Sequence, residues 1–552
     1  MLTVKPRSAP IAAKVRGCTS GLKPSQLKKL QRLAQRRYPN QGGLSREQVW
    51  ELAGLTQETG RQLGILIDRQ GRPEMVIVGE SSQIVIPELG RQRQHSGRLR
   101  GLRLVHTHLG QEGLSEEDLM DMVFLRLDSI AVLEVVGQGE PGHVQWAHLL
   151  PANSEAKPYS VSPRQPWDRV DTDFHAQAEA VEEELARRQE GVALEPRENT
   201  ALLVSVGTKP RHRLETELEE LADLAATAGL TVAGRLVQRV GRLNPKYILG
   251  RGKLAELEVN ALQANAGIIV FDGELSPSQM RNLAQITERK VLDRTQLILD
   301  IFAQHATSRA GKLQVEMAQL KYTLPRLVGQ NRALSRLAGG IGGRGPGETK
   351  LELDRRKVRE RITRIRKELE KVRQHRAHTR SRRFEAGVPI VALVGYTNAG
   401  KSTVLNTITH SQVTAEDKLF ATLDPTSRRI RFPEEREVVL TDTVGFIREL
   451  PEDLREAFLA TLEELEEADV LVQVADAGHP ELEEQVAAVD DILHDMGLDT
   501  IPRLLALNKW DTLSAEAQQR VRNIFPQGLP TTAVKKKGLD ALVQAILKRL
   551  PA

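Results

Sequence analysis

A glycine-rich loop, Gly395-x-x-x-x-Gly400-Lys401-Ser402, follows the apolar run of residues 388–394 and precedes a second apolar stretch. This order of patterns predicts a strand, a tight loop and the first turn of a helix. Glycines let the backbone curl so that successive N–H groups converge on one anion, and a helix N-terminus attracts negative charge. We therefore expect a phosphate in this loop, with Lys401 reaching its oxygens and Ser402 ligating Mg²⁺.

A second motif, Asp442-Thr443-Val444-Gly445, ends the apolar run of residues 438–440. The Asp442 carboxylate can hold the hydration shell of the same metal ion, and the Gly445 N–H can meet a γ-phosphate. Hydrolysis of that phosphate would release the contact, which is how nucleotide switches work.

A third motif, Asn508-Lys509-Trp510-Asp511, completes the series. The Asp511 carboxylate can accept from the ring N–H and the exocyclic amine of guanine, whereas adenine offers no such donor pair on that edge. Three motifs in this order predict a P-loop domain that binds GTP or GDP with Mg²⁺.

The composition limits the other possibilities. A chain of 552 residues with 40% hydrophobic content can fill several cores, so we expect three or four domains. The single cysteine, Cys18, excludes a disulfide framework and is typical of a reducing cytoplasm. No apolar stretch approaches the ~20 residues that cross a bilayer, and nothing near Met1 resembles a secretory signal. We therefore expect a cytoplasmic protein without a membrane span.

Positive charge gathers in two segments. Residues 1–45 are rich in lysine and arginine and contain no acidic residue, which favours a basic arm but leaves an organelle transit peptide open. Residues 350–383 hold fifteen basic and five acidic residues. Apolar residues recur there at spacings of four and three, and a matching series lies upstream, so we expect an antiparallel helical hairpin whose basic face follows a polyanion. The two series are Val358, Ile362, Ile365, Leu369 and Val372, and Leu313, Met317, Leu320 and Leu324.

Residues 338–348, which join the two expected helices, are too rich in glycine for a helix or strand. Arg344 lies in this segment. The sequence is compatible either with a tip that approaches a phosphate-rich surface or with a plain flexible connection.

Alternating strand and helix patterns over residues 201–307 predict another α/β domain. Its strands are expected at residues 202–206, 231–237 and 268–271, with helices at 214–226, 253–264 and 276–288. Gly250-Arg251-Gly252 before one of these helices could cradle a second phosphate, but an ordinary helix entry explains it better.

Over residues 201–552, the sequence resembles the HflX family of translation-factor-class GTPases. The resemblance is carried by the glycine-rich run leading into Leu351-Glu-Leu-Asp-Arg-Arg, by residues 395–403, by Phe420-Ala-Thr-Leu-Asp424-Pro-Thr, and by Asp442-Thr-Val-Gly-Phe446. It implies a factor that binds the large ribosomal subunit and its rRNA and dissociates idle or stalled ribosomes, often under stress; we expect the chain itself to be a monomer. The glycine-rich tip would then lie near the peptidyl transferase centre. A GTPase for another RNA, in tRNA modification or ribosome assembly, remains the alternative.

The resemblance also assigns residues. Thr422 matches a switch threonine that closes on Mg²⁺, so Ser402 and Thr422 are the expected metal ligands, and Lys401, Thr422 and Gly445 the expected catalytic groups. Phe446 stands where many GTPases place a water-orienting glutamine, which predicts slow intrinsic hydrolysis that a partner accelerates. The whole expected nucleotide site comprises Gly395, Tyr396, Thr397, Asn398, Ala399, Gly400, Lys401, Ser402, Phe420, Ala421, Thr422, Leu423, Asp424, Asp442, Thr443, Val444, Gly445, Asn508, Lys509, Trp510, Asp511, Thr532, Ala533 and Val534. Residues 532–534 depart from the usual Ser-Ala-Lys.

The first ~165 residues extend beyond that family and predict a further α/β unit, with strands at residues 64–67, 75–78, 102–106 and 130–136. His106-Thr-His108 with Ser115-x-x-Asp118 resembles the zinc site of JAMM metalloproteases, in which two histidines and an aspartate hold the metal. The spacing to Ser115 is one residue short, Leu109 replaces a proline, and no upstream glutamate base is assignable. These departures favour a degenerate fold that acts as a binding module over an active zinc hydrolase.

We therefore expect an α/β protein in six parts: a basic arm (1–45), an α/β extension (46–165), a linker (166–200), an α/β domain (201–310), a helical hairpin with a glycine-rich tip (311–385) and a P-loop GTPase domain (386–552).

Overall fold

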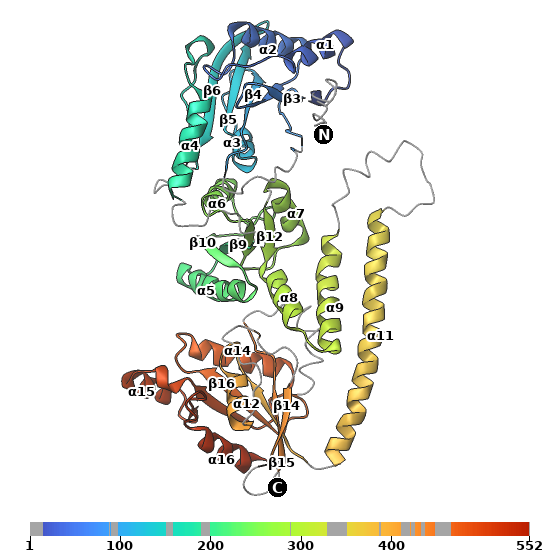
Figure 1. Ribbon diagram of the computed structural model, residues 1–552, viewed down its shortest axis with the longest axis vertical. Coiled ribbons are helices and arrows are strands. Elements are labelled where there is room, and N and C mark those ends of the chain that lie inside the picture. Colours follow the sequence, from blue (N-terminus) through green and yellow to red (C-terminus); the bar gives the residue numbers. More distant parts are fainter. Residues whose placement is uncertain are drawn as a thin grey trace, which may run out of the picture. The chain divides into compact units, whose positions relative to one another are not determined.

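The computed structural model describes residues 15–87, 89, 98–150, 158–188, 199–287, 289–327, 350–385, 388–409, 420, 426–431, 437–447 and 465–550 (Figure 1). The chain forms two compact units, one of Met1–Leu218 with Leu230–Leu292 and one of Glu219–Gly229 with Asp293–Ala552. Three sheets with packed helices confirm the predicted α/β class. Over the described residues, no helix has the length and apolarity that a membrane crossing requires. The glycine-rich tip at residues 338–348 lies outside the described residues.

The first sheet has the strand order β1-β3-β2-β4-β5-β6-β7, with β8 paired to β6. Its strands are β1 (Val15–Gly17), β2 (Leu63–Asp68), β3 (Pro73–Val78), β4 (Leu102–Leu109), β5 (Ser129–Val136), β6 (Glu140–Leu149), β7 (Tyr159–Val161) and β8 (Gln165–Pro166). Its helices are α1 (Pro24–Leu33), α2 (Arg46–Thr59), α3 (Glu116–Phe124) and α4 (Phe174–Arg188). The four strands predicted for the extension are confirmed as β2, β3, β4 and β5.

The extension begins earlier and ends later than the sequence predicts. β1 pairs with β3, and α1 buries Leu30 and Leu33 in the core on one face of the sheet, so residues 15–45 are folded rather than a free arm. In the predicted linker, α4 buries Val181 and Leu185 in the core on the other face. Charge dominates both segments in the sequence, but each keeps one narrow apolar stripe that is enough to attach it to the sheet.

The second sheet is built on β9, which pairs in parallel with both β10 and β11. Its strands are β9 (Thr200–Gly207), β10 (Thr231–Arg239), β11 (Ile268–Phe271) and β12 (Lys290–Asp293), and its helices include α5 (Arg211–Thr227), α6 (Arg251–Gln263) and α7 (Pro277–Ile286). The predicted strands and helices of this region are confirmed. One face of α6 packs into the core of the first sheet through Val259 and Leu262. Gly250 is the N-cap of α6, and Arg251 pairs with Glu117 at 3.5 Å, which fits an ordinary helix entry.

The second unit contains the predicted hairpin. After α8 (Arg294–His305), α9 (Arg309–Arg326) and α11 (Lys350–Glu385) lie side by side (Figure 1). Leu313, Met317, Ile362 and Ile365 form its buried seam, as predicted. Glu316 accepts two hydrogen bonds from Arg361, at 2.6 and 2.7 Å, which fixes the register of the two helices.

The third sheet carries the three motifs. Its order is β14-β15-β13-β16-β17-β18, with β14 antiparallel to β15 and the other neighbours parallel. The strands are β13 (Ile390–Val394), β14 (Thr426–Arg431), β15 (Glu437–Asp442), β16 (Val470–Asp476), β17 (Arg503–Asn508) and β18 (Leu529–Pro530); the helices are α12 (Lys401–Thr409), α14 (Leu482–Asp495), α15 (Ala515–Ile524) and α16 (Leu539–Arg549). Each motif stands at the carboxyl end of a parallel strand, namely β13, β15 or β17. These ends meet at one edge of the sheet, where open α/β folds bind ligands.

Candidate functional site

The glycine loop closes between β13 and α12 against the third motif. Gly400 has φ +93°, and a side chain there would collide with the Asn508 amide. That amide donates a 2.9 Å hydrogen bond to the Ala399 carbonyl. A residue with a Cβ would be strained at this φ and would also clash with the Asn508 amide, which explains the glycine at this position.

Lys401 is buried at the first turn of α12. Its Nζ donates to the carbonyls of Gly395 (3.1 Å) and Tyr396 (2.9 Å). Burial lowers the pKa of this ammonium to about 8, although the Asp442 carboxylate opposes the shift. The loop thus holds a desolvated cation that donates to carbonyl oxygens, and a phosphate oxygen can satisfy this cation better because it is charged.

Ser402 and Asp442 bring two oxygen ligands together. The Ser402 hydroxyl donates to Asp442 Oδ2 at 2.6 Å, and the Asp442 side chain is fully buried. Nearby, the Thr443 hydroxyl donates to the Leu393 carbonyl at 2.7 Å and fixes the end of β15 against β13. A hydroxyl and a carboxylate are oxygen donors of the kind that Mg²⁺ prefers, so these residues fit the metal.

Gly445 and Phe446 pack tightly against the glycine loop. The Phe446 N–H donates to the Gly395 carbonyl (3.1 Å), and the Thr397 N–H donates to the Phe446 carbonyl (2.8 Å). A Cβ on Gly445 would lie 2.8 Å from the Thr397 Cα, so a larger residue would displace the loop. The Phe446 ring is buried, and it has no group that could orient a water molecule.

The third motif joins β17 to the segment after β18. Asn508 Oδ1 accepts from the Ala533 N–H at 3.1 Å, so one side chain links the glycine loop, β17 and residues 532–534. Lys509 adopts φ +56° and pairs with Asp476 at 2.8 Å. Asp511 pairs with Lys535 at 2.6 Å, and that contact lowers the pKa of the Asp511 carboxyl. A carboxylate that stays charged is the group a guanine edge requires.

The remaining predicted residues divide into two sets. Tyr396, Thr397, Asn398, Val444, Trp510, Thr532 and Val534 lie on the loops already described, and the Val534 side chain is 83% exposed. Ala421, Thr422, Leu423 and Asp424 lie outside the described residues, and so does the expected metal contact of Thr422. Phe420 is described: it is buried, has φ +57° and packs edge-on against Phe302 of α8 at 4.6 Å.

Two charged residues near the loop have no counterpart in the motifs. The Tyr396 hydroxyl donates to Glu220 Oε1 at 2.8 Å, and Glu220 also pairs with Arg294 at 3.1 Å. Glu220 lies on α5 and Arg294 begins α8, more than one hundred residues before the loop. A search for local motifs cannot find such partners, because only the fold brings them together.

A second cluster of polar side chains lies in the extension. His106 and His108 on β4 and Asp118 on α3 are buried, and their ligand atoms all lie within 4.8 Å of one another. His106 Nε2 is 3.1 Å from both His108 Nε2 and Asp118 Oδ1, and His108 Nε2 is 3.5 Å from Asp118 Oδ2. The alternation of β4 puts both histidines on one face, and the capping turn of α3 brings Asp118 to it.

The electrostatics of this cluster resemble those of a metal site. Burial would raise the pKa of Asp118, but the contacts with His106 and Ser115 outweigh burial and hold that pKa well below its usual range. Burial and the neighbouring His106 lower the pKa of His108. A neutral histidine beside an ionised carboxylate is the protonation state in which these groups bind a metal.

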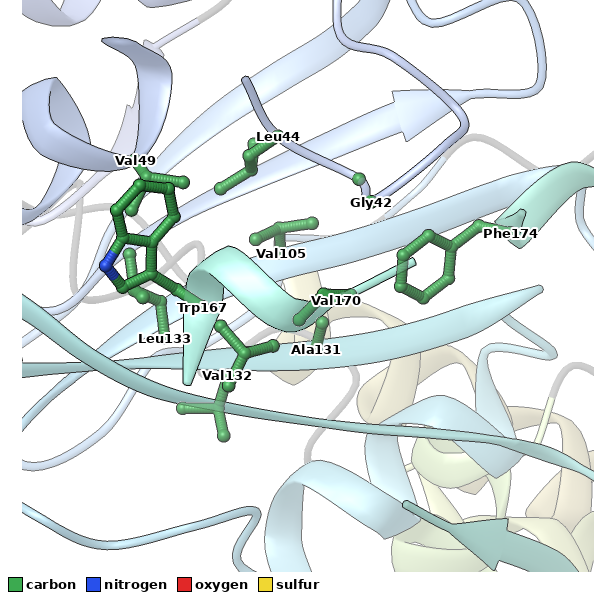
Figure 2. A pocket seen from close by; sticks show the side chains of 12 residues that line it. Gly42, Leu44, Val49, Val105, Ala131, Val132, Leu133, Trp167, Val170 and Phe174 are labelled. Atoms are coloured by element: carbon green, nitrogen blue, oxygen red, sulfur yellow. The ribbon is translucent and has the colours of Figure 1, made fainter. Parts of the chain in front are cut away.

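A small cavity in the extension carries no comparable chemistry. It lies beside β4 and β5, and Figure 2 shows Trp167 and Phe174 flanking it. All its lining residues are glycine or hydrophobic, and its volume is about 20 Å³, which is room for roughly one water molecule.

Comparison with known families covers much of the chain. The family described as "GTP-binding GTPase N-terminal" matches residues 215–303, "GTP-binding GTPase Middle Region" matches residues 305–383, and "50S ribosome-binding GTPase" matches residues 390–509. The last match contains the first two motifs whole and reaches Asn508 and Lys509 of the third.

Individual relatives agree with these families. A GTPase HflX from Caldanaerobacter subterraneus subsp. tengcongensis is 48% identical over 368 residues, covering 67% of this chain and 82% of that protein. The GTPase HflX of Escherichia coli K12 is 45% identical over 337 residues, covering 60% and 79%. Among solved structures, a GTP-binding protein from Sulfolobus solfataricus in complex with GDP is 25% identical, covers 64% of this chain and 98% of that one, and has a TM-score of 0.36.

Proposed function

Because the chain belongs to the HflX family of GTPases, we propose that it uses GTP hydrolysis to time its binding to the large ribosomal subunit and to separate idle or stalled ribosomes. The chain is a GTPase that converts GTP to GDP and phosphate with Mg²⁺. The ribosome as target, its separation and any link to stress are the proposed part.

In the proposed nucleotide site, the Lys401 ammonium leaves the carbonyls of Gly395 and Tyr396 and binds β- and γ-phosphate oxygens. The N–H groups of the loop and of the first turn of α12 surround the same phosphates. Ser402 and Asp442 would hold Mg²⁺ in place of their mutual hydrogen bond. When bound, the metal would neutralise charge at the oxygens where negative charge develops.

Two observations support a ribosomal target. The family matched by residues 390–509 is described as binding the 50S ribosome. Helix α11 exposes basic residues, among them Arg359, Arg364 and Arg366, outside the buried seam that it shares with α9. Exposed basic residues along a long helix suit a folded RNA, because they can neutralise several of its phosphates.

We expect isolated large subunits to raise the hydrolysis rate at least about tenfold, because Phe446 cannot orient the attacking water and a partner has to do so. The measurement is phosphate release at saturating GTP, with and without 50S subunits. Bulk tRNA at equal nucleotide concentration is the control. An unchanged rate with 50S subunits would contradict the proposal, and stimulation by tRNA instead would favour tRNA modification.

Sedimentation distinguishes ribosome separation from ribosome assembly. With a non-hydrolysable GTP analogue, intact 70S ribosomes should shift to 50S and 30S peaks and the chain should travel with the 50S peak. With GDP, the 70S peak should persist. Binding confined to immature 50S particles would support the assembly alternative.

A second function is favoured by the geometry of His106, His108 and Asp118. We propose that these residues hold one divalent ion of the zinc class, because two imidazoles and a carboxylate already converge in a buried place. Among the described residues, Asp118 is the one carboxylate with a ligand atom in this cluster, and the sequence offers no assignable glutamate base upstream. The proposal is therefore a metal-dependent binding module, with a zinc hydrolase as the alternative.

The purified full-length chain should contain about one equivalent of zinc, and His106→Ala or Asp118→Asn should reduce it below about one tenth, because two remaining ligands bind weakly. Element analysis after dialysis measures this. The control is His175→Ala, on α4 and outside the cluster. Circular dichroism checks that the variants fold. A metal-free wild-type chain after growth in zinc-supplemented medium would refute the proposal.

A further inference from the structure

We infer that Glu220 on α5 and Phe302 on α8 are positioning residues for GTP, although both precede the GTPase domain in the sequence. Each contacts one component that a GTPase reaction requires: Glu220 the glycine loop, and Phe302 the start of the segment that contains Thr422. The inference rests on the proposed nucleotide site and adds to it a dependence on the two upstream helices.

Glu220 holds the glycine loop through Tyr396. Tyr396 directly follows Gly395, its side chain is 5% exposed, and its hydroxyl donates to Glu220 at 2.8 Å. The carbonyl of the same residue accepts from Lys401. The position of Tyr396 therefore affects the group that would bind the β- and γ-phosphates. Arg294 pairs with Glu220 at 3.1 Å and keeps the carboxylate directed at the hydroxyl.

The second contact joins Phe302 to Phe420. The Phe302 ring is fully buried, and it meets the ring of Phe420 edge-on, with centroids 4.6 Å apart and an interplanar angle of 80°. Phe420 adopts φ +57°, a conformation that costs a non-glycine residue free energy and that persists only when the surroundings enforce it. The Phe302 ring is the aromatic group observed in contact with Phe420 and so belongs to those surroundings.

The two contacts predict different effects on ligands. The glycine loop binds phosphates that GDP and GTP share, so the Glu220 contact should affect both nucleotides equally. The family resemblance assigns Thr422, two residues after Phe420 in the sequence, to the metal of the GTP-bound site, so the Phe302 contact should affect GTP alone. A merely structural role would lower thermal stability without producing this pattern.

The experiment measures binding of fluorescent GDP and of a fluorescent non-hydrolysable GTP analogue to the full-length chain. Glu220→Ala should weaken both about three- to tenfold, less than the full worth of a hydrogen bond to a charged group, because the loop keeps its other contacts and the effect on the nucleotide is indirect. Glu220→Gln should recover most of the loss, because its amide oxygen can still accept from Tyr396. Phe302→Leu should weaken only the GTP analogue, by about two- to tenfold, since it removes an aromatic pair but keeps an apolar side chain.

Two control variants accompany these. Glu219→Ala changes the exposed neighbour of Glu220, and Leu299→Ala shortens another buried side chain of α8. Glu219→Ala should leave both affinities unchanged, and Leu299→Ala should leave their ratio unchanged. The inference is overturned if Glu220→Ala binds as Glu219→Ala does, or if Phe302→Leu weakens GDP as much as the analogue. If the wild-type chain bound neither nucleotide, the proposed site itself would fail instead.

Discussion

Replacing Asp511 by asparagine is expected to weaken GTP and GDP binding about a hundred- to a thousandfold. The proposed carboxylate accepts two hydrogen bonds from the guanine edge, each worth roughly 1.5–3 kcal/mol when the acceptor is charged. The asparagine amide keeps the shape but presents a donor to one of the guanine donors. The contact with Lys535 lowers the pKa of the Asp511 carboxyl and so favours its charged form.

The same variant provides its own specificity test. Xanthine has a carbonyl oxygen where guanine has the exocyclic amine, so the amide N–H₂ that Asp511→Asn introduces can donate to it. Xanthosine triphosphate should then bind the variant better than GTP does, reversing the wild-type order. Calorimetric titration of both nucleotides into both proteins measures this. Asp540→Asn, in the exposed first turn of α16, is the control. An unchanged preference for GTP would mean that another residue reads the base.

The fold of the GTPase domain could be predicted from short sequence patterns, because each of its motifs and the strand before it lie close together in the sequence. Strand, loop and helix follow one another within a few residues at Gly395, and parallel pairing of β13, β15 and β17 through β16 then brings three distant motifs to one edge. The hairpin could be predicted as well, since its apolar residues keep the spacing of four and three although most of the other residues are charged.

The boundaries of the extension could not be predicted in the same way. Charge dominates α1 and α4, and the few apolar residues that attach them, such as Leu30 and Leu185, have meaning only once the sheet is present. Likewise, α6 shares its buried surface between the second sheet and the core of the first. A sequence shows that such a helix has apolar residues but not which partner will cover them.

The residues that contact the nucleotide site from the upstream helices could not be predicted from the sequence either. Glu220 and Phe302 belong to helices whose patterns are ordinary, and nothing in the sequence distinguishes Glu220 from its neighbour Glu219. Their role follows from a 2.8 Å hydrogen bond and an edge-on ring contact that exist only in the folded second unit.

Removing four exposed charges from α11 should weaken binding to 50S subunits about a hundredfold near 0.1 M salt. Each basic side chain at a phosphate releases counterions on binding, so the loss should also lower the slope of log K against log salt by roughly 3. The variant replaces Arg359, Arg364, Arg366 and Lys367 by glutamine, which keeps helix propensity and leaves the buried seam of the hairpin intact.

Its control removes the same charge elsewhere: Lys28, Arg32, Arg520 and Lys548, exposed on α1, α15 and α16, are replaced by glutamine. If attraction were only a matter of net charge, both variants would lose affinity equally, because the chain total falls from +5 to about +1 in each. A loss confined to the α11 variant, with nucleotide affinity unchanged in both, would assign the RNA contact to the hairpin. Equal losses of affinity for 50S subunits would instead mean that the hairpin contributes only to the net positive charge of the chain. The main structural support for a specific ribosomal site would then be lost.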